Sequence, residues 1–174
     1  MNVLPRSPPR VTSQGLFFDM NARLAGLITA LIAAIVLGLV YYAQYGLQLV
    51  PCELCLLERW PYRIVLIAGI LAALLGGGVA RGLVALAGGA MLTNVAISGL
   101  HAGVELHWWA SPFPECNGIL TPGAALPMVP SAACDRGVYL LQGLPLTMTQ
   151  MDFIASICFM ILFFFMASLS RRRL

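Results

Sequence analysis

The sequence contains no lysine and is poor in charge of either sign. Its 174 residues include ten basic residues, all arginine, and seven acidic ones, so charged residues make up 10% of the chain. Soluble domains carry about 25% charged residues. With 60% hydrophobic residues and a mean hydropathy of +0.87, the composition argues against a soluble domain and predicts an integral membrane protein.

Two further features are missing from the sequence. It has no basic tract with interleaved aromatic residues, so nucleic acid is not an expected partner. The first apolar run is too long for a signal peptide, and no A-x-A-like cleavage site follows it. We therefore interpret residues 1–23 as a cytoplasmic N-terminal arm that precedes the first membrane helix.

Apolar runs of about 20 residues, the length needed to cross a bilayer, predict three spans. These lie over about residues 24–45, 82–104 and 151–170. A fourth run, 64–75, covers only roughly 18 Å at 1.5 Å per residue before the glycines at 76–78. We expect this helix to extend back into ERWPYR and begin near Glu58, with Pro61 in its first turn. The predicted fold is therefore an all-α membrane protein, a four-helix transmembrane bundle.

The distribution of charge predicts the orientation of this bundle. Four spans put both termini on one side, together with the short connection that holds Arg81. That side carries seven of the ten arginines and one acid, whereas the other side carries three arginines and six acids. The positive-inside rule makes the first side cytoplasmic. The prediction is a membrane domain over 24–170, a cytoplasmic tail over 171–174, and two outer loops at about 46–57 and 105–150.

Four of the five cysteines fall in the outer loops. Cys52 and Cys55 form a Cys-x-x-Cys in the first loop, and Cys116 and Cys134 lie in the second. Two structural disulfides are one interpretation, since disulfides are common outside the cytoplasm. A Cys116–Cys134 bridge fits it well. A Cys52–Cys55 bridge fits poorly, because it closes a very small loop and restricts the unfolded chain little.

The Cys52–Cys55 spacing suits thiol–disulfide exchange, because the second cysteine can attack a mixed disulfide formed on the first. A helix N-terminus and a nearby arginine favour the thiolate, and the helix start near Glu58 and the charge of Arg59 would supply both. Zinc is a weaker alternative, because the second pair lacks close spacing and an oxidising compartment disfavours free thiolates; we predict no metal site. We interpret Cys158, within the fourth span, as a small buried hydrophobic residue.

Two short segments resemble a known family. PCELCLLER at 51–59 and SPFPEC at 111–116, with a later Cys134 in a four-span chain, resemble the DsbB family of bacterial inner-membrane disulfide bond formation proteins. The resemblance covers about residues 20–170. It implies periplasmic outer loops, oxidation of a periplasmic DsbA-like thioredoxin-fold partner, and reduction of a membrane quinone, either ubiquinone or menaquinone.

The resemblance also implies roles for individual residues. The partner's thiolate would attack Cys116, and Cys134 would then pass the electrons to Cys52. Cys55 would contact the quinone as a thiolate, and Arg59 would stabilise that thiolate and the developing negative charge. All four cysteines are thus catalytic candidates.

His101 and Glu58 are further candidates at the quinone site. An ionisable residue at the end of a membrane span suggests a function, and His101 would be a proton donor. Alternatively, His101 is an interfacial histidine or pairs with Glu105 one helical turn away. Glu58 would orient Arg59 or remain a solvated charge. Two other functions stay open at this point: a specialised paralogue that serves one client, and a non-catalytic membrane protein with two structural disulfides.

Overall fold

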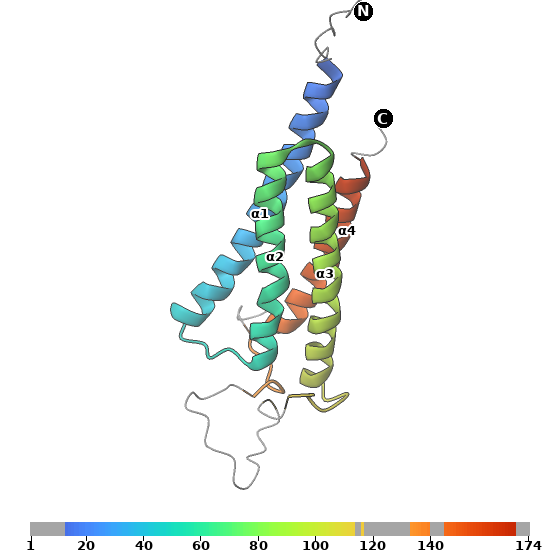
Figure 1. Ribbon diagram of the computed structural model, residues 1–174. Coiled ribbons are helices and arrows are strands. Elements are labelled where there is room, and N and C mark those ends of the chain that lie inside the picture. Colours follow the sequence, from blue (N-terminus) through green and yellow to red (C-terminus); the bar gives the residue numbers. More distant parts are fainter. Residues whose placement is uncertain (1–12, 114–115, 117–132, 140–144, 170–174) are drawn as a thin grey trace, which may run out of the picture.

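The computed structural model describes residues 13–113, 116, 133–139 and 145–169, which form four α-helices and no strand (Figure 1). The helices are α1 (Ser13–Tyr45), α2 (Glu53–Leu75), α3 (Gly77–Glu105) and α4 (Met148–Leu169). The first twelve residues of the predicted arm, half of the second outer loop and the predicted tail lie outside the described residues.

Three of the four helices are long and apolar enough to cross a membrane. They are α1 from Asn21 onward, α3 and α4. The first half of α2 carries four charged side chains, at positions 53, 58, 59 and 63, which sets it apart by composition. The prediction of an all-helical membrane protein is confirmed, and the chain is a multi-pass membrane protein.

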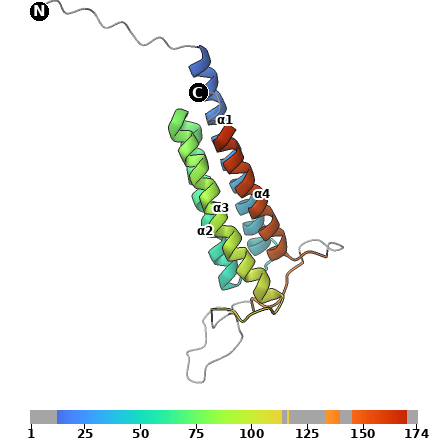
Figure 2. The same cartoon turned by 90° about the vertical axis from the view of Figure 1, so that its right-hand side faces the viewer.

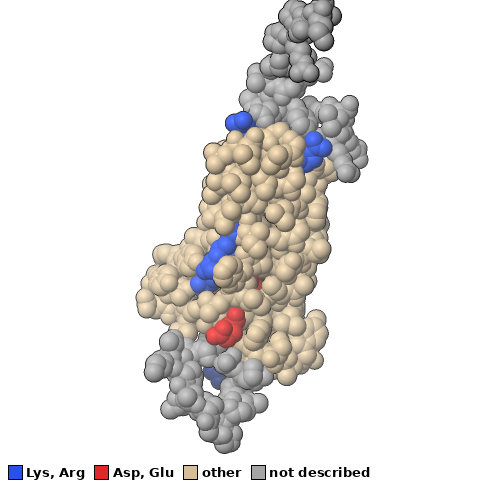
Figure 3. Space-filling model, in the orientation of Figure 1, with Lys and Arg blue, Asp and Glu red and all other residues tan. Residues whose placement is uncertain are grey.

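The helices form a bundle in which neighbours in sequence are neighbours in space. α1 packs on α2, α2 on α3 and α3 on α4, and α1 also contacts α3. The Ser13 end of α1 and the Leu169 end of α4 lie at the same end of the bundle as the α2–α3 turn (Figures 1 and 2). The other end holds the α1–α2 connection and the residues before α4; we call it the loop end. On the face shown in Figure 3, basic side chains lie at the terminal end and in a stripe about halfway along the bundle, and acidic ones lie toward the loop end.

Small residues let α1 and α2 approach each other closely. A Cβ added at Gly69 would lie 2.5 Å from the Ala30 backbone nitrogen, and one added at Gly26 would lie 2.5 Å from that of Ala73. Membrane helices pack through such small residues because lipid offers no hydrophobic drive for helix association. The α1–α2 contact therefore depends on Gly26 and Gly69, and it fixes the position of α2 beside α1.

The start of α2 differs from the sequence prediction. The helix begins at Glu53, five residues earlier than expected, and Cys52 is its N-cap residue. The Cys52 sulfur accepts a hydrogen bond from the Cys55 N–H, so a thiol takes the part usually played by a Ser, Thr, Asp or Asn oxygen. Pro61 consequently lies inside the helix and not in its first turn.

The connection between α2 and α3 is shorter than the sequence suggested. α2 ends at Leu75, as the run of glycines predicted, and Gly76 with a φ of 69° is both its C-cap and the N-cap of α3. Arg81 therefore lies within α3 and not in a loop. A positive φ is readily adopted by glycine, and Gly77 also has one, of 58°, so these two glycines allow the chain to reverse between α2 and α3.

The prediction that Cys158 is buried was wrong. Its side chain is exposed on the outer face of α4, whereas Ser156, two positions earlier, is fully buried. At 3.6 residues per turn, two positions correspond to about 200° around a helix. Cys158 therefore points away from the interior of the bundle.

Candidate redox site

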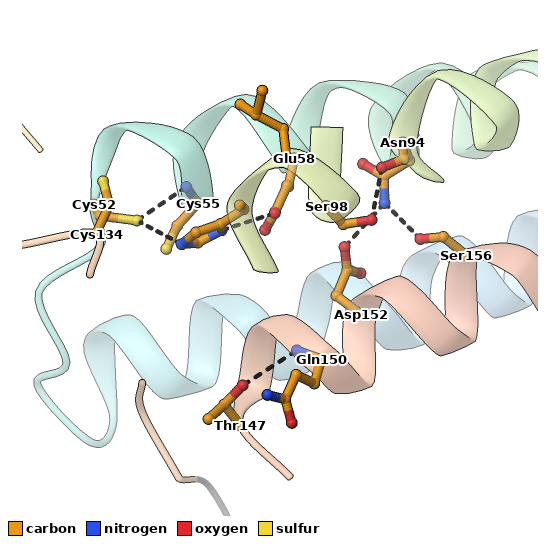
Figure 4. A network of polar contacts seen from close by, with 12 residues as sticks. Cys52, Cys55, Glu58, Asn94, Ser98, Cys134, Thr147, Gln150, Asp152 and Ser156 are labelled. Carbon is orange, nitrogen blue, oxygen red and sulfur yellow. Dashed lines mark hydrogen bonds and ion pairs between the residues drawn. The ribbon is translucent and has the colours of Figure 1, made fainter. Parts of the chain in front are cut away.

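Cys52 and Cys55 are free thiols at the start of α2. Cys52 is buried at 3% exposure and Cys55 is half-buried. The Cys55 N–H donates to the Cys52 sulfur over 3.2 Å (Figure 4). The sequence predicted that a helix N-terminus would act on this pair, and the structure places Cys52 at that N-terminus.

Cys52 is linked to a histidine, and the histidine to a carboxylate, by a chain of side-chain contacts. His101 on α3 places its Nε2 atom 3.6 Å from the Cys52 sulfur and its Nδ1 atom 2.9 Å from Glu58 Oε1. His101 is only 3% exposed. A carboxylate at Nδ1 holds the proton on that nitrogen, so Nε2 faces the sulfur as an acceptor when the ring is neutral. Glu58 therefore orients His101. The sequence had suggested different partners for both residues: Arg59 for Glu58, and Glu105 for His101.

The two thiols differ in acidity. The pKa of Cys52 lies below its ordinary value, chiefly because the Cys55 side chain hydrogen-bonds to its sulfur, with the Cys55 N–H adding to the effect. The pKa of Cys55, in the first turn of α2, lies above its ordinary value because its proton is held by Cys52, with burial adding to the effect. When both thiols are reduced, Cys52 is therefore the one that ionises first.

Arg59 lies in the interior, at 6% exposure. Its Nη1 donates to Gln44 Oε1 over 2.5 Å, and its guanidinium carbon lies 5.3 Å from the centre of the Tyr41 ring. Both partners belong to α1 and were missed by sequence reasoning. The only feature of the sequence that could have pointed to Gln44 and Tyr41 is that they are polar residues at the end of an apolar run. Among the described residues, the buried Nε of Arg59 has no hydrogen-bond partner.

The second cysteine pair lies against the first. Cys116 and Cys134 form a disulfide and are both buried. They pack in one cluster with Cys52, Leu54 and Val104, and Cys55 lies against that cluster. Figure 4 shows Cys134 close to Cys52. The four outer cysteines, which the sequence divides between two loops, thus meet at the loop end of the bundle.

A cavity of about 300 Å³ opens beside the free thiols. Its walls are largely apolar side chains of α1 and α4, and its polar lining includes every predicted site residue of α2 and α3. These lining residues are Cys52, Cys55, Glu58, Arg59 and His101. The volume lies at the lower end of the range for small-molecule sites.

A second polar cluster adjoins the same cavity, which two of its members, Tyr62 and Asp152, also line. Asp152 on α4 accepts hydrogen bonds from the Tyr62 hydroxyl, at 2.7 Å, and from the Asn94 amide, at 3.0 Å. Asn94 also donates to Ser156 (Figure 4). We call these four residues the Asp152 cluster; they join α2, α3 and α4. Sequence reasoning missed them, although an acid at the start of an apolar span is a recognisable signal.

Because the free pair and the bonded pair share one cluster, thiol–disulfide exchange can carry electrons between them. This defines the class of the protein as a membrane-embedded thiol–disulfide oxidoreductase. A family model described as disulfide bond formation protein DsbB matches residues 22–166. The chain therefore belongs to the DsbB family and is a disulfide oxidoreductase of disulfide bond formation, as the resemblance indicated. No curated protein and no solved structure matches it.

Proposed function

We propose that the chain is a quinone-reducing thiol oxidase that reoxidises a periplasmic DsbA-like thioredoxin-fold protein. One observation carries the proposal: the free Cys52–Cys55 pair, Arg59 and His101 line a single, largely apolar cavity. A purely structural role for the first pair would not require such a cavity. It would also not require an imidazole beside one of the sulfurs.

The residues of the cavity fit a quinone headgroup. Its apolar walls suit a ring, and the buried Nε of Arg59 is a donor without a partner among the described residues. A quinone carbonyl could accept that hydrogen bond. Cys55, Glu58, Arg59 and His101 would hold the ring of ubiquinone or menaquinone. When bound, a quinone supplies an acceptor for two electrons and two protons.

The two pairs pass electrons inward by disulfide exchange. A partner thiolate attacks Cys116, so the Cys116–Cys134 bond opens as a partner–Cys116 bond forms. The second thiol of the partner then releases the partner as a disulfide, which leaves Cys116 and Cys134 reduced. Cys134 next attacks Cys52 of the oxidised Cys52–Cys55 pair, which releases Cys55 as a thiolate. Cys116 then attacks Cys134, which restores the outer disulfide and leaves Cys52 and Cys55 reduced. Each complete exchange moves two electrons and two protons and reduces one disulfide for each one formed.

His101 and Arg59 divide the work at the inner pair. Nε2 of His101 takes the proton of Cys52, and Glu58 stabilises the charge that the ring gains. During the exchange Cys52 becomes bonded to another sulfur. Because the Cys52–Cys55 bond breaks in the same step, Cys55 leaves as a thiolate. Arg59 lies on the same cavity and stabilises that charge.

We place the protein in the bacterial inner membrane, with α2 as a fourth span and the loop end on the periplasmic side. The excess of arginine on the terminal side supports this orientation. Arg63 supports the assignment of α2, because its guanidinium carbon lies 4.9 Å from the centre of the exposed Trp60 ring. Such a pair is typical of a helix that enters the membrane interface. Both termini are then cytoplasmic.

Purified protein, quinone and a reduced thioredoxin-fold partner test the proposal when quinone absorbance and partner oxidation are followed together. We expect one quinone reduced for each partner disulfide formed, and no turnover in Cys52→Ser or Cys55→Ser. Cys158→Ser is the matched control and should keep full activity. Arg59→Ala should raise the quinone KM about tenfold, which corresponds to about 1.4 kcal/mol, near the value of one hydrogen bond from a charged donor. Continued turnover in either α2 cysteine variant would refute the proposal.

A further inference from the structure

Three possible metal-ligand atoms lie together beside the start of α2 when the cysteines are reduced. Two come from Cys52 and Cys55, and the third comes from His101 on α3. The ligand atoms of Cys52, Cys55 and His101 all lie within 4.8 Å of one another. In tetrahedral zinc sites, metal–sulfur bonds of about 2.3 Å and metal–nitrogen bonds of about 2.0–2.1 Å hold the donors about 3.4–3.8 Å apart. The 3.6 Å between the Cys52 sulfur and His101 Nε2 already has this spacing.

The surroundings of the three donors are those of a metal site. Zinc-bound histidines typically give their other ring nitrogen to a carboxylate, which fixes the tautomer and aims the ring. Glu58 Oε1 does this here, at 2.9 Å from Nδ1. The N-terminus of α2 and the Cys55 N–H favour a thiolate at Cys52. The donors border the cavity, which leaves a fourth coordination position open to a water molecule.

We propose that the reduced Cys52–Cys55 pair and His101 bind one soft metal cation of the zinc class, and that the bound cation arrests electron transfer. Two metal–sulfur bonds and one metal–nitrogen bond form, and two thiol protons are released to solvent. No electron moves. The cation holds both sulfurs that the reaction needs, so bound protein cannot form the inner disulfide. The oxidised pair offers no thiolate, so the site exists only in the reduced protein.

The Cys2His donor set identifies the class of cation. Thiolates select zinc, copper(I) and similar soft ions over magnesium or calcium, which take oxygen ligands. The inference needs only the free thiols and the imidazole. It is therefore independent of which acceptor the oxidase uses, and it can fail while the proposed function stands.

The test uses full-length protein in detergent, freed of quinone, with Cys116→Ala, Cys134→Ala and Cys158→Ser so that only the inner pair remains. Cadmium is the probe, because its bonds to thiolates give an ultraviolet absorption band, and zinc then competes for the site. We expect one cation per reduced chain and none after the pair is oxidised. In otherwise unmodified protein, zinc should stop turnover with the reduced partner, and a chelator should restore it.

Variants distinguish this site from an ordinary dithiol. Glu58→Gln should weaken binding about 10–100-fold, the usual effect of losing the carboxylate behind a ligating histidine. His101→Ala should weaken it at least as much, and His101→Gln serves if the alanine variant does not fold. His107→Ala, an exposed histidine six residues further along, is the matched control and should not change affinity. Equal affinity in the two His101 variants and their parent, or binding by the oxidised pair, would overturn the proposal.

Discussion

Replacing Glu58 by glutamine measures how much its carboxylate contributes to the reaction of Cys52. The substitution keeps the size of the side chain and an oxygen that can accept from His101 Nδ1, but it removes the charge. Hydrogen bonds to charged groups are worth about 1.5–3 kcal/mol, and neutral ones about 0.5–1.5 kcal/mol. The 2.9 Å contact is buried on both sides, so the difference of about 1–1.5 kcal/mol should appear nearly in full. At 1.4 kcal/mol per factor of ten, the turnover number should fall about tenfold.

The second arm of the experiment tests whether this loss passes through His101. His101→Ala removes the base beside Cys52, and general acid–base catalysis typically contributes a factor of about 10²–10⁴. If Glu58 acts only by orienting and charging the imidazole, Glu58→Gln should have no further effect in the His101→Ala protein. The energies of the two changes would then be strongly non-additive, as expected for residues that act as one unit.

The assay is oxidation of the reduced partner at saturating quinone in four proteins: the parent, the two single variants and the double variant. Thermal unfolding in detergent shows that each is folded. Glu53→Gln is the matched control, because Glu53 is an exposed acid in the same motif; it should stay within twofold of the parent. The same tenfold loss with and without His101 would refute the reasoning. It would mean that Glu58 acts on another group, such as the neighbouring Arg59.

Three further predictions follow from the packing and from the thiol acidities. Asp152→Leu should cost about 1–3 kcal/mol and lower the midpoint of thermal unfolding, because it removes two buried hydrogen bonds, from Tyr62 and Asn94, at about 0.5–1.5 kcal/mol each; an unchanged midpoint would show that these two bonds add no stability. Gly69→Leu should abolish the folded yield, since its Cβ would already strike α1, whereas Gly38→Leu, with nothing within 4 Å, should fold normally. In reduced protein, iodoacetamide should modify Cys52 before Cys55. Because the pKa of Cys52 is lowered, this reaction should persist at a pH below the ordinary thiol pKa and fade only as the pH drops through the lowered value; faster modification of Cys55 would contradict this order.

The features that the sequence predicted correctly are those set by local chemistry. Length and apolarity locate a membrane helix without knowledge of its neighbours, and the glycines after Leu75 end α2 for reasons contained in their own backbone. The nearness of Cys52 and Cys55 to a helix start is likewise local, whereas their redox role, inferred from their spacing, stays a prediction. The early start of α2 was missed because a cysteine is an unusual N-cap residue, so the usual signal of a Ser, Thr, Asp or Asn was absent.

The features that the sequence did not predict depend on contacts between helices. The rule that side chains four apart share a face suggested Glu105 for His101, but it can only find partners on the same helix. The partner found in the structure, Glu58, lies 43 positions away on α2. Gln44 is 15 positions from Arg59 and on α1. The closeness of these side chains depends on how the helices pack, which the small residues at the α1–α2 contact help to determine.

Glu58 and Arg59 show why adjacent opposite charges need not form an ion pair. Consecutive residues on a helix point about 100° apart, so Glu58 faces His101 on α3 while Arg59 faces Gln44 and Tyr41 on α1. In the proposed mechanism the carboxylate thereby acts, through His101, on the proton of Cys52. The hydrogen bond and the ring contact of the guanidinium are both with uncharged groups, although a buried charge is costly without a compensating one. The guanidinium of Arg59 is stabilised most when a negative charge forms in the cavity that it lines. In the proposed mechanism that happens during electron transfer, when Cys55 leaves as a thiolate, so the same burial that weakens the resting state would favour the reacting one.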